Sequence, residues 1–214
     1  MLHRIDTVLF DFDGTLVEVS IDFAEMRRGV LSLGLEYDVS PKPDLYILES
    51  IGDIFENLLQ RDADQANDFK RRAEKLIIDI EMEAATRAKM IPGADKTLTG
   101  LRDRGVKVGI VTRNCRSAVM KASKNTGFVY DLLLTRDDVK KAKPDPQHLL
   151  DALALLNSKP ENSLMVGDHP LDILAGKKAG MKTAAVLTTK SSADFCDVAP
   201  DIILTCVSNL LTAL

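Results

Sequence analysis

The sequence lacks the features that mark membrane-embedded and secreted proteins. No apolar run approaches the ~20 residues that a membrane-spanning helix needs. The opening stretch, MLHRIDTVLF, is too short and too acidic for a secretory signal. Cysteine is scarce: Cys115, Cys196 and Cys206 sit at no metal-ligand spacing, and their odd number fits reduced thiols better than disulfides. We therefore expect a soluble, cytoplasmic protein with no membrane partner.

The sequence also lacks a strongly basic segment. Its formal net charge is −4 at pH 7, and the closest approach to a basic run is KKAK at 140–143. Nucleic-acid binding needs clustered Lys and Arg, so we expect no nucleic-acid partner. Internal repeats and low-complexity tracts are absent as well. With 214 residues, 45% of them hydrophobic, the chain can bury a substantial core in one or two domains.

Short apolar runs rich in branched residues mark the expected strands. Each is followed at once by polar residues or glycine, as is typical of buried strands in a parallel sheet. The runs lie at 7–10, 106–111, 132–134, 163–166, 183–186 and 202–204. Helix-like segments bounded by Pro92 and Gly105, and by Pro170 and Gly180, alternate with them. This alternation predicts an α/β fold, a doubly wound parallel sheet with helices on both faces.

Residues 18–89 break that rhythm. Apolar residues recur at three- and four-residue steps between Leu45 and Leu59, as on one face of a helix. A second helical stretch, dense in Lys, Arg and Glu, runs from about Asp64 to Met90, and no strand signal is present. The sequence therefore predicts an all-helical cap at 18–89, inserted into a catalytic core formed by 1–17 and 90–214. We expect the cap to close over the site and to select the substrate.

Polar motifs follow four of the expected strands. They are DFDGT at 11–15, TRN at 112–114, KPDP at 143–146 and GDHPLD at 167–172. In an open parallel sheet, ligands bind outside the carboxyl ends of the strands, where the strand order reverses. Buried carboxylates are costly unless something compensates them, so acids gathered there call for a cation. Ligand sets made only of oxygen favour a hard ion, Mg²⁺ before Ca²⁺.

The first motif predicts the reactive groups. With a metal ion and Lys143 nearby, Asp11 stays ionised and can attack phosphorus as a nucleophile. Asp13, two residues further on, can protonate a leaving oxygen and later take a proton from water. Gly14 lets the chain turn sharply away and leaves room for a substrate.

The segments DFDGTLV, VTRN, KPDP and GDHPLD, in this order, resemble the four signature motifs of the haloacid dehalogenase superfamily. The resemblance is closest to its phosphoglycolate-phosphatase-like branch, which carries a helical cap between the first and second motifs. It covers nearly the whole chain. It implies a Rossmannoid core, Mg²⁺ as cofactor and phosphatase activity on a small phosphorylated metabolite. Whether the enzyme is a monomer or homodimer stays open.

The resemblance also implies roles for the acidic residues. Asp11 would form an aspartyl-phosphate, and Asp13 would act as general acid and base while its backbone carbonyl binds Mg²⁺. Asp168 would be a metal ligand. Asp172 would bind the metal too or support its ligands, although an acid there would equally suit the positive N-terminus of a helix.

A second set of motif residues is implied to bind phosphate. Thr112 would donate a hydrogen bond to the transferring phosphoryl group, which Gly14, Arg113 and Asn114 would surround. Lys143 would neutralise charge on the nucleophile and on the phosphate. Phosphoryl transfer depends mainly on such positioning and charge stabilisation.

Three further features of the sequence bear on which reaction the protein catalyses and on which substrate it binds. Dehalogenases and phosphonate hydrolases of the superfamily lack the second aspartate, so the presence of Asp13 argues against C–halogen and C–P cleavage. His169 replaces a small hydroxyl residue after the fourth-motif aspartate; it either contacts substrate or is an ordinary loop histidine. Arg27 and Arg28 in the cap are candidate substrate anchors, or else part of a solvated helix face.

Two other functions share many of these residues. A sugar-phosphate mutase similar to β-phosphoglucomutase would use every core residue named above and differ in how its cap excludes water. A non-enzymatic receiver module also combines acids, a Thr and a Lys on a doubly wound sheet. Receivers, however, place adjacent acids after the first strand, whereas one residue separates Asp11 from Asp13 here. The sequence therefore favours an enzyme over a receiver. It leaves phosphatase and mutase open, although Thr15 after Gly14 resembles the phosphatases more.

Overall fold

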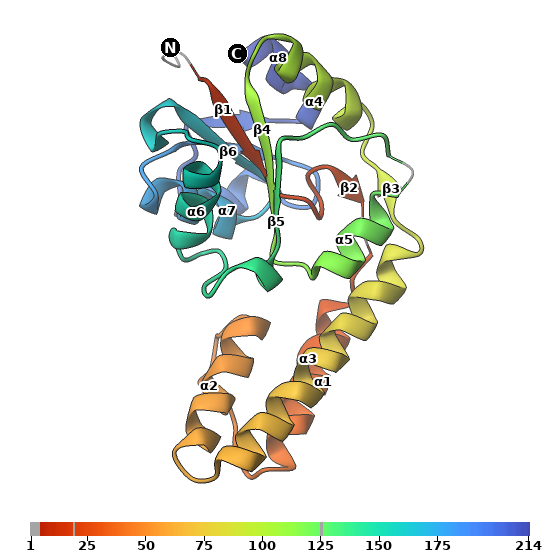
Figure 1. Ribbon diagram of the computed structural model, residues 1–214, viewed down its shortest axis with the longest axis vertical. Helices are drawn as coiled ribbons and strands as arrows, with labels where there is room; N and C mark the ends of the chain where they lie inside the picture. The colour runs from red at the N-terminus through yellow and green to blue at the C-terminus, as the bar shows by residue number, and fades with distance from the viewer. Residues whose placement is uncertain (1–4, 19, 125) are drawn as a thin grey trace. The chain divides into compact units, whose positions relative to one another are not determined.

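The computed structural model describes residues 5–18, 20–124 and 126–214. The chain divides into two compact units (Figure 1). One is Ser20–Thr86, and the other combines the N-terminal segment with Arg87–Leu214. Each unit has its own hydrophobic core, described separately below.

The larger unit contains a parallel sheet, which has six strands in the described part of the chain. Its order is β5-β4-β1-β6-β7-β8 (Figure 1). The chain starts near the middle at β1, runs outward through β4 and β5, and returns to the other side of β1 at β6. This order confirms the doubly wound α/β fold and places the reversal of strand order beside β1. The strands are β1 (Thr7–Phe10), β4 (Lys107–Val111), β5 (Leu132–Leu134), β6 (Ser163–Gly167), β7 (Lys182–Val186) and β8 (Ile202–Leu204).

Alternate residues of the central strands point to opposite faces of the sheet, as the two-residue period of a strand requires. Val8 and Phe10 pack into one hydrophobic cluster and Leu9 into another. All three are fully buried, which stabilises the fold by roughly 1.5–3 kcal/mol for each large apolar side chain. The first face is covered by α4 (Ala94–Asp103), α5 (Arg116–Ala122) and α8 (Leu210–Ala213), and the second by α6 (Gln147–Leu155) and α7 (Pro170–Lys178). Short 3₁₀ helices lie at Arg136–Asp138, Pro160–Asn162, Ser192–Phe195 and Val207–Asn209.

The smaller unit is helical in its described residues. Asp22 and Asp62 cap α1 and α3 by accepting hydrogen bonds from backbone N–H groups of the first turn, which would otherwise lack partners. Apolar residues at helical spacing, such as Ile54 on α2 and Phe69 on α3, form the core of this unit. The helices are α1 (Phe23–Leu35), α2 (Ile47–Leu59) and α3 (Ala63–Ala85).

The edges of the insertion differ from the sequence-based prediction. The expectation of no strand within 18–89, and of a helix reaching Met90, was wrong. The helix ends at Ala85, and a two-stranded antiparallel sheet follows, in which β2 (Val17–Glu18) pairs with β3 (Lys89–Met90). Two-residue strands are too short to show a period in the sequence. This pairing brings the two ends of the insertion together.

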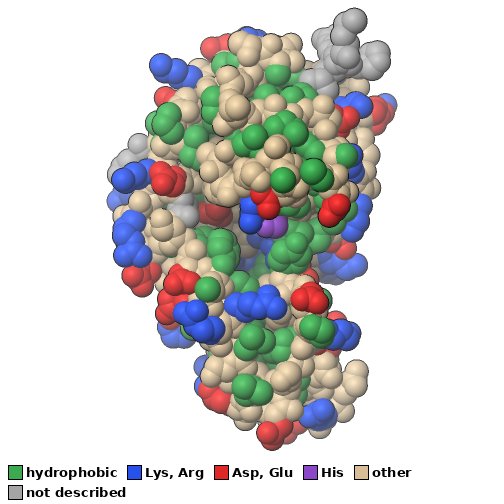
Figure 2. Space-filling model, turned by 180° about the vertical axis from the view of Figure 1, so that it is seen from behind, with side chains coloured by type: hydrophobic (Ala, Val, Ile, Leu, Met, Phe, Trp, Pro, Cys, Tyr) green, Lys and Arg blue, Asp and Glu red, His purple; other side chains and the backbone are tan. Residues whose placement is uncertain are grey.

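Two further observations concern the helices and the charged side chains of the described residues. Within the described residues, no helix combines the length and the apolar character that crossing a membrane would require. On the face drawn in Figure 2, Lys and Arg side chains are interspersed with Asp and Glu over each unit. That face therefore shows no large patch of one charge.

Candidate active site

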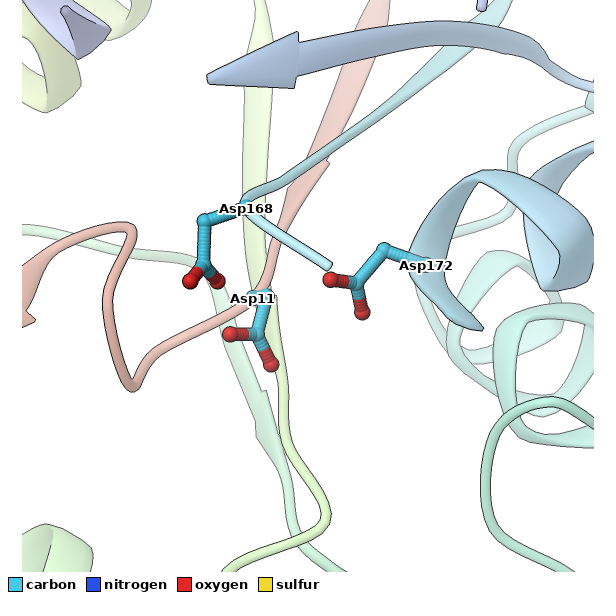
Figure 3. Close-up of side chains that lie close together, drawn as sticks. All are labelled: Asp11, Asp168 and Asp172. Carbon is cyan, nitrogen blue, oxygen red and sulfur yellow. The ribbon is translucent and has the colours of Figure 1, made fainter. Parts of the chain in front are cut away.

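Three aspartates converge at the carboxyl end of the sheet (Figure 3). Asp11 follows β1, Asp168 follows β6, and Asp172 lies in the first turn of α7. A carboxylate oxygen of each lies within 4.8 Å of the other two, and all three residues are buried. The hydrogen bonds between β1 and β6 continue past the end of β1, where the Asp11 N–H donates to the Val166 carbonyl at 2.8 Å. The structure thus brings together acids that are 161 residues apart in sequence, from 11 to 172.

A buried lysine joins two of these acids. The Lys143 ammonium, whose side chain is 1% exposed, donates to Asp11 Oδ1 and to Asp172 Oδ1, each at 2.7 Å. Burial alone would lower the pKa of Lys143, but the charges of Asp11 and Asp172 raise it above its usual value. The side chain therefore remains an ammonium ion, as the sequence-based role in charge neutralisation requires.

The acids themselves carry an excess of negative charge. Burial raises the pKa of Asp11 well above its usual value; Lys143 opposes this, and the charges of Asp172 and Asp168 reinforce it. Burial, followed by the charge of Asp172, raises the pKa of Asp168 to about 6. One ammonium among three carboxylates does not balance them, so the donor set fits a divalent, oxygen-binding cation.

Two glycines allow the carboxylates to approach the backbone. Gly14 has φ +84°, and a Cβ built on it would lie 2.2 Å from Asp168 Oδ2. A Cβ on Gly167 would lie 2.3 Å from Asp172 Oδ2. Any larger residue would push these carboxylates from their places. Gly14 therefore shapes the side of the site that Asp168 occupies, and its contact with phosphate stays a prediction.

Two hydroxyls orient the Asp168 carboxylate. Thr15 Oγ1 donates to Oδ1 at 3.2 Å, and Thr189 Oγ1 donates to Oδ2. Thr15 belongs to the first motif, whereas Thr189 lies in the turn after β7 and follows no motif. Sequence reasoning missed Thr189, because nothing in its neighbours shows that the turn after β7 reaches the end of β6.

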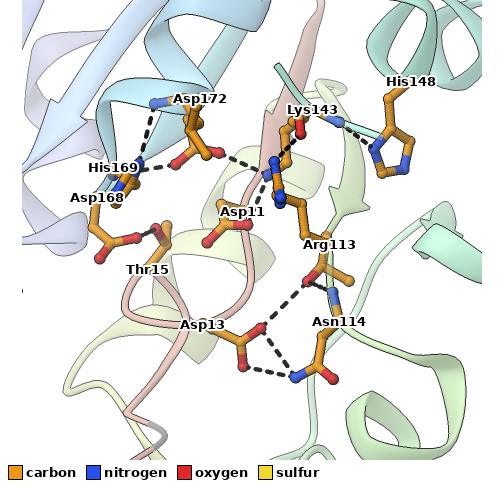
Figure 4. A network of polar contacts seen from close by, with 12 residues as sticks. Asp11, Asp13, Thr15, Arg113, Asn114, Lys143, His148, Asp168, His169 and Asp172 are labelled. Atoms are coloured by element: carbon orange, nitrogen blue, oxygen red, sulfur yellow. Dashed lines mark hydrogen bonds and ion pairs between the residues drawn. The ribbon is translucent and has the colours of Figure 1, made fainter. Parts of the chain in front are cut away.

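Asp13 faces a different set of groups (Figure 4). Asn114 Nδ2 donates to both of its carboxylate oxygens at 3.1 Å, and Thr112 Oγ1 donates to Oδ2 at 3.3 Å. The Asn114 N–H in turn donates to Thr112 Oγ1 at 3.0 Å. The Asp13 side chain lies outside the cluster of three aspartates. Thr112 and Asn114 thus hold the expected acid–base group, and their contacts with phosphate stay predictions.

Asp172, in the first turn of α7, both caps its helix and contacts Lys143. The His169 N–H donates to Asp172 Oδ2 at 3.1 Å, and His169 Nδ1 accepts from the Leu171 N–H at 3.2 Å. This reciprocal capping fixes the helix start while Asp172 Oδ1 holds Lys143. Burial lowers the pKa of His169, which favours the neutral ring that this cap uses. A contact of His169 with substrate stays a prediction.

The remaining predicted residues are three arginines, of which Arg113 and Arg27 donate to backbone carbonyls. Arg113 Nη1 donates to the Lys143 carbonyl, so at least part of its guanidinium holds the backbone of the third motif. Arg27 and Arg28 are exposed on α1 of the helical unit, and Arg27 Nη1 donates to the Leu45 carbonyl at 2.8 Å. The roles of these arginines toward phosphate or substrate stay predictions.

Comparison with known proteins shows what the whole chain is similar to. The family model for haloacid dehalogenase-like hydrolases matches residues 8–186. The chain is 34% identical over 220 residues to the pyrophosphatase PpaX of Bacillus cereus (strain B4264), across 99% of this chain and 97% of that protein.

Solved structures share the fold over the whole chain. A crystal structure of a haloacid dehalogenase-like hydrolase from Bacteroides fragilis superposes with a TM-score of 0.72 at 25% identity, covering 97% of this chain and 100% of that one. A predicted phosphoglycolate phosphatase from Haemophilus somnus gives a TM-score of 0.64 at 17% identity, covering 100% and 99%. The second likeness concerns the fold alone.

Proposed function

This chain belongs to the haloacid dehalogenase-like hydrolase family and is a phosphatase of that family, and from this premise we propose that it hydrolyses a small phosphate compound with Mg²⁺ through an aspartyl-phosphate on Asp11. The observation that carries the proposal is the buried contact of 2.7 Å between the Asp11 carboxylate and the Lys143 ammonium, beside Asp168 and Asp172. This arrangement holds a nucleophile among groups that can balance a phosphoryl charge.

The proposed reaction has two steps. In the first, an Asp11 oxygen bonds to phosphorus, the bond from phosphorus to the leaving oxygen breaks, and Asp13 gives its proton to that oxygen. In the second, Asp13 takes a proton from water, whose oxygen attacks the same phosphorus. The bond to Asp11 then breaks, which releases inorganic phosphate, restores the Asp11 carboxylate and leaves Asp13 protonated for the next turnover. Thr112 and Asn114 hold Asp13 in place through both steps.

The cluster of Asp11, Asp168 and Asp172 is the place where the chain would hold Mg²⁺, with Asp172 as a ligand or as support for one. When bound, the ion supplies positive charge to the phosphoryl oxygens and to the carboxylates. Thr15 and Thr189 orient Asp168 for this role, and Lys143 balances Asp11 from the other side.

Two substrate classes fit this chemistry. The motif pattern favours a small organic phosphomonoester such as phosphoglycolate, a sugar phosphate or a nucleotide. The name of the 34%-identical relative, a pyrophosphatase, favours pyrophosphate instead. In pyrophosphate the leaving group is itself a phosphate, so the same nucleophile and the same acid serve both substrates. A β-phosphoglucomutase-like mutase remains the alternative that shares the core residues.

Release of inorganic phosphate tests the proposal. The purified protein is offered phosphoglycolate, sugar phosphates, nucleotides and pyrophosphate, each with Mg²⁺ and with EDTA, and Asp11→Asn serves as the inactive control. We expect release that depends on Mg²⁺ and on Asp11, and the best substrate decides between the two classes. Isomerisation of a sugar phosphate without release of phosphate would point to the mutase. Release that persists in Asp11→Asn would exclude the covalent mechanism.

We also propose that the enzyme works in the cytoplasm on a small phosphorylated metabolite, as a monomer or homodimer. Cys115, Cys196 and Cys206 are free thiols, as a reducing compartment favours. Cell fractionation and light scattering of the purified protein test the compartment and the oligomeric state.

A further inference from the structure

Lys143 is held at its backbone as well as at its ammonium (Figure 4). Its main-chain N–H donates to His148 Nδ1 at 3.3 Å, and its carbonyl accepts from Arg113 Nη1. The two holding side chains come from different places in the fold, the first turn of α6 and the loop after β4. With the contacts of Nζ to Asp11 and Asp172, both ends of the lysine are therefore fixed.

His148 is a buried polar residue that the proposed chemistry does not use. Its exposed fraction is 0%, and its neighbour Leu149 packs into the core between α6 and the sheet. Burial, reinforced by the charge of Lys143, lowers the pKa of His148 to about 3, so the ring is neutral near pH 7. Nε2 makes no hydrogen bond of ordinary geometry to a described residue, although the Leu134 carbonyl favours the protonated ring. The polar contact that links the ring to the active site is the one in which Nδ1 accepts from the Lys143 N–H.

We propose that His148 is a positioning residue for Lys143: its Nδ1 fixes the main chain from which the ammonium reaches Asp11. A lysine has a long, flexible stem, and its ammonium stays between two carboxylates only if its Cα is held in place. Lys143 precedes α6 and lies outside the helices and strands of the described residues. A side-chain nitrogen therefore accepts the hydrogen bond that a backbone carbonyl would accept from an N–H within a helix or strand. The expected effect of His148 on turnover rests on the proposed function. Its expected effect on the position of the Lys143 ammonium does not.

Three substitutions at position 148 separate the acceptor from the volume of the ring. His148→Leu fills the space without an acceptor. His148→Asn places an amide oxygen where Nδ1 lies, and His148→Gln places one nearer to Nε2. Thr97→Val is the matched control, because Thr97 is a fully buried core residue whose hydroxyl donates to the Gly93 carbonyl at 2.8 Å, away from the site.

Nitrogen NMR of the lysine ammonium groups is the first measurement, since it needs no substrate. A buried, paired ammonium exchanges its protons slowly, and Lys143→Met identifies its signal by removing it. We expect the signal to persist in His148→Asn and Thr97→Val, and to broaden or shift in the leucine and glutamine variants. An unchanged signal in both of the latter would overturn the proposal, whether or not the protein hydrolyses any tested substrate.

Turnover is the second measurement. Small misplacements of a catalytic group cost up to about 100-fold in rate, so we expect His148→Leu and His148→Gln to lower kcat by about 10- to 100-fold with little change in KM. His148→Asn should recover most of the rate, and Thr97→Val should stay within about twofold of the parent.

A double-mutant cycle shows whether the effect passes through the lysine. In a Lys143→Met background, adding His148→Leu should cause little further loss in kcat. An equal loss in both backgrounds would mean that His148 acts on something else and would contradict the proposal. Wild-type turnover in Lys143→Met alone would instead refute the proposed function, and the NMR result would still decide the role of His148.

Discussion

At the scale of single residues, Asp11 and Asp13 have different tasks, and their amide variants should separate them. Asp11→Asn removes the nucleophile and should abolish turnover. Asp13→Asn removes only proton transfer, which typically contributes about 10²–10⁴-fold, so it should leave a slow residual rate. Steady-state kinetics with a thermal melt checks both variants. Folding should be preserved in each, because the amides keep the shape of the carboxylates.

Wild-type turnover in Asp11→Asn would contradict the covalent mechanism. Full loss of activity in Asp13→Asn together with a lowered melting temperature would show that the contacts of Asp13 with Asn114 and Thr112 are needed for folding rather than for proton transfer. Thr97→Val again serves as the control for the loss of one buried hydrogen bond.

Asp168 should make the metal-free protein sensitive to pH. Its pKa is raised from 3.8 to about 6 in the folded state, mainly by burial. Between these values the folded state binds the proton more tightly than the unfolded state does, so stability falls as the pH rises from about 4 to about 6. The full effect is on the order of 3 kcal/mol. Urea unfolding in EDTA at several pH values measures it.

The matched variant for this prediction is Asp168→Asn, whose side chain cannot titrate. Its stability should therefore fall much less than that of the parent over the same pH range. Added Mg²⁺ should restore stability at pH 7 in the parent, because the cation favours the ionised carboxylates. A metal-free protein whose stability does not change over this pH range would contradict the assignment of the raised pKa.

At the scale of elements, the turn after β1 carries the chain from Asp11 to a close approach of Gly14 to Asp168. Gly14→Ala would place a methyl group 2.2 Å from Asp168 Oδ2, in a residue with φ +84°. Gly105→Ala is a matched control, because Gly105 has φ +75° but no atom within 4 Å of the added methyl. Both variants should lose about 1–2 kcal/mol of stability from the left-handed backbone. Only Gly14→Ala should also lose Mg²⁺-dependent turnover, measured by titrating the metal against phosphate release.

The elements also show how far the sequence predicts the structure. The strand runs at 7–10, 132–134 and 202–204 match the observed strands to the residue, because buried strands leave continuous apolar runs. The helix α1 was expected only as part of the helical cap and without bounds, and the short β2 and β3 left no period to detect. Motif residues at strand ends could be predicted to converge, since parallel topology alone brings them together.

The contacts that escaped prediction depend on how loops fold back onto the site. Thr189 reaches Asp168 from the turn after β7, and His148 reaches the Lys143 backbone from the first turn of α6. Neither contact follows from a residue type or a spacing, because loop paths depend on the packing of the whole unit. No sequence motif includes His148, yet the residue is fully buried beside the third motif.

At the scale of the whole molecule, the two units should be separable. The pairing of Val17 with Met90 and of Glu18 with Lys89 brings the ends of the insertion side by side. Replacing residues 20–86 by a short Gly/Ser turn would therefore close a hairpin without stretching the core. The three aspartates and Lys143 all belong to the larger unit, which has its own hydrophobic clusters.

We therefore expect the shortened chain to fold and still to gain thermal stability from Mg²⁺. Its phosphatase rate should fall, because the helical unit that would select substrate and exclude water is gone. Circular dichroism and thermal melts with and without Mg²⁺ measure the first two properties, and Asp168→Asn in the shortened chain should remove the Mg²⁺ effect. A folded chain without that effect would mean that metal binding needs residues of the helical unit. An unfolded chain would mean that the core depends on the insertion for stability, despite the separate clusters in which each unit buries its apolar residues.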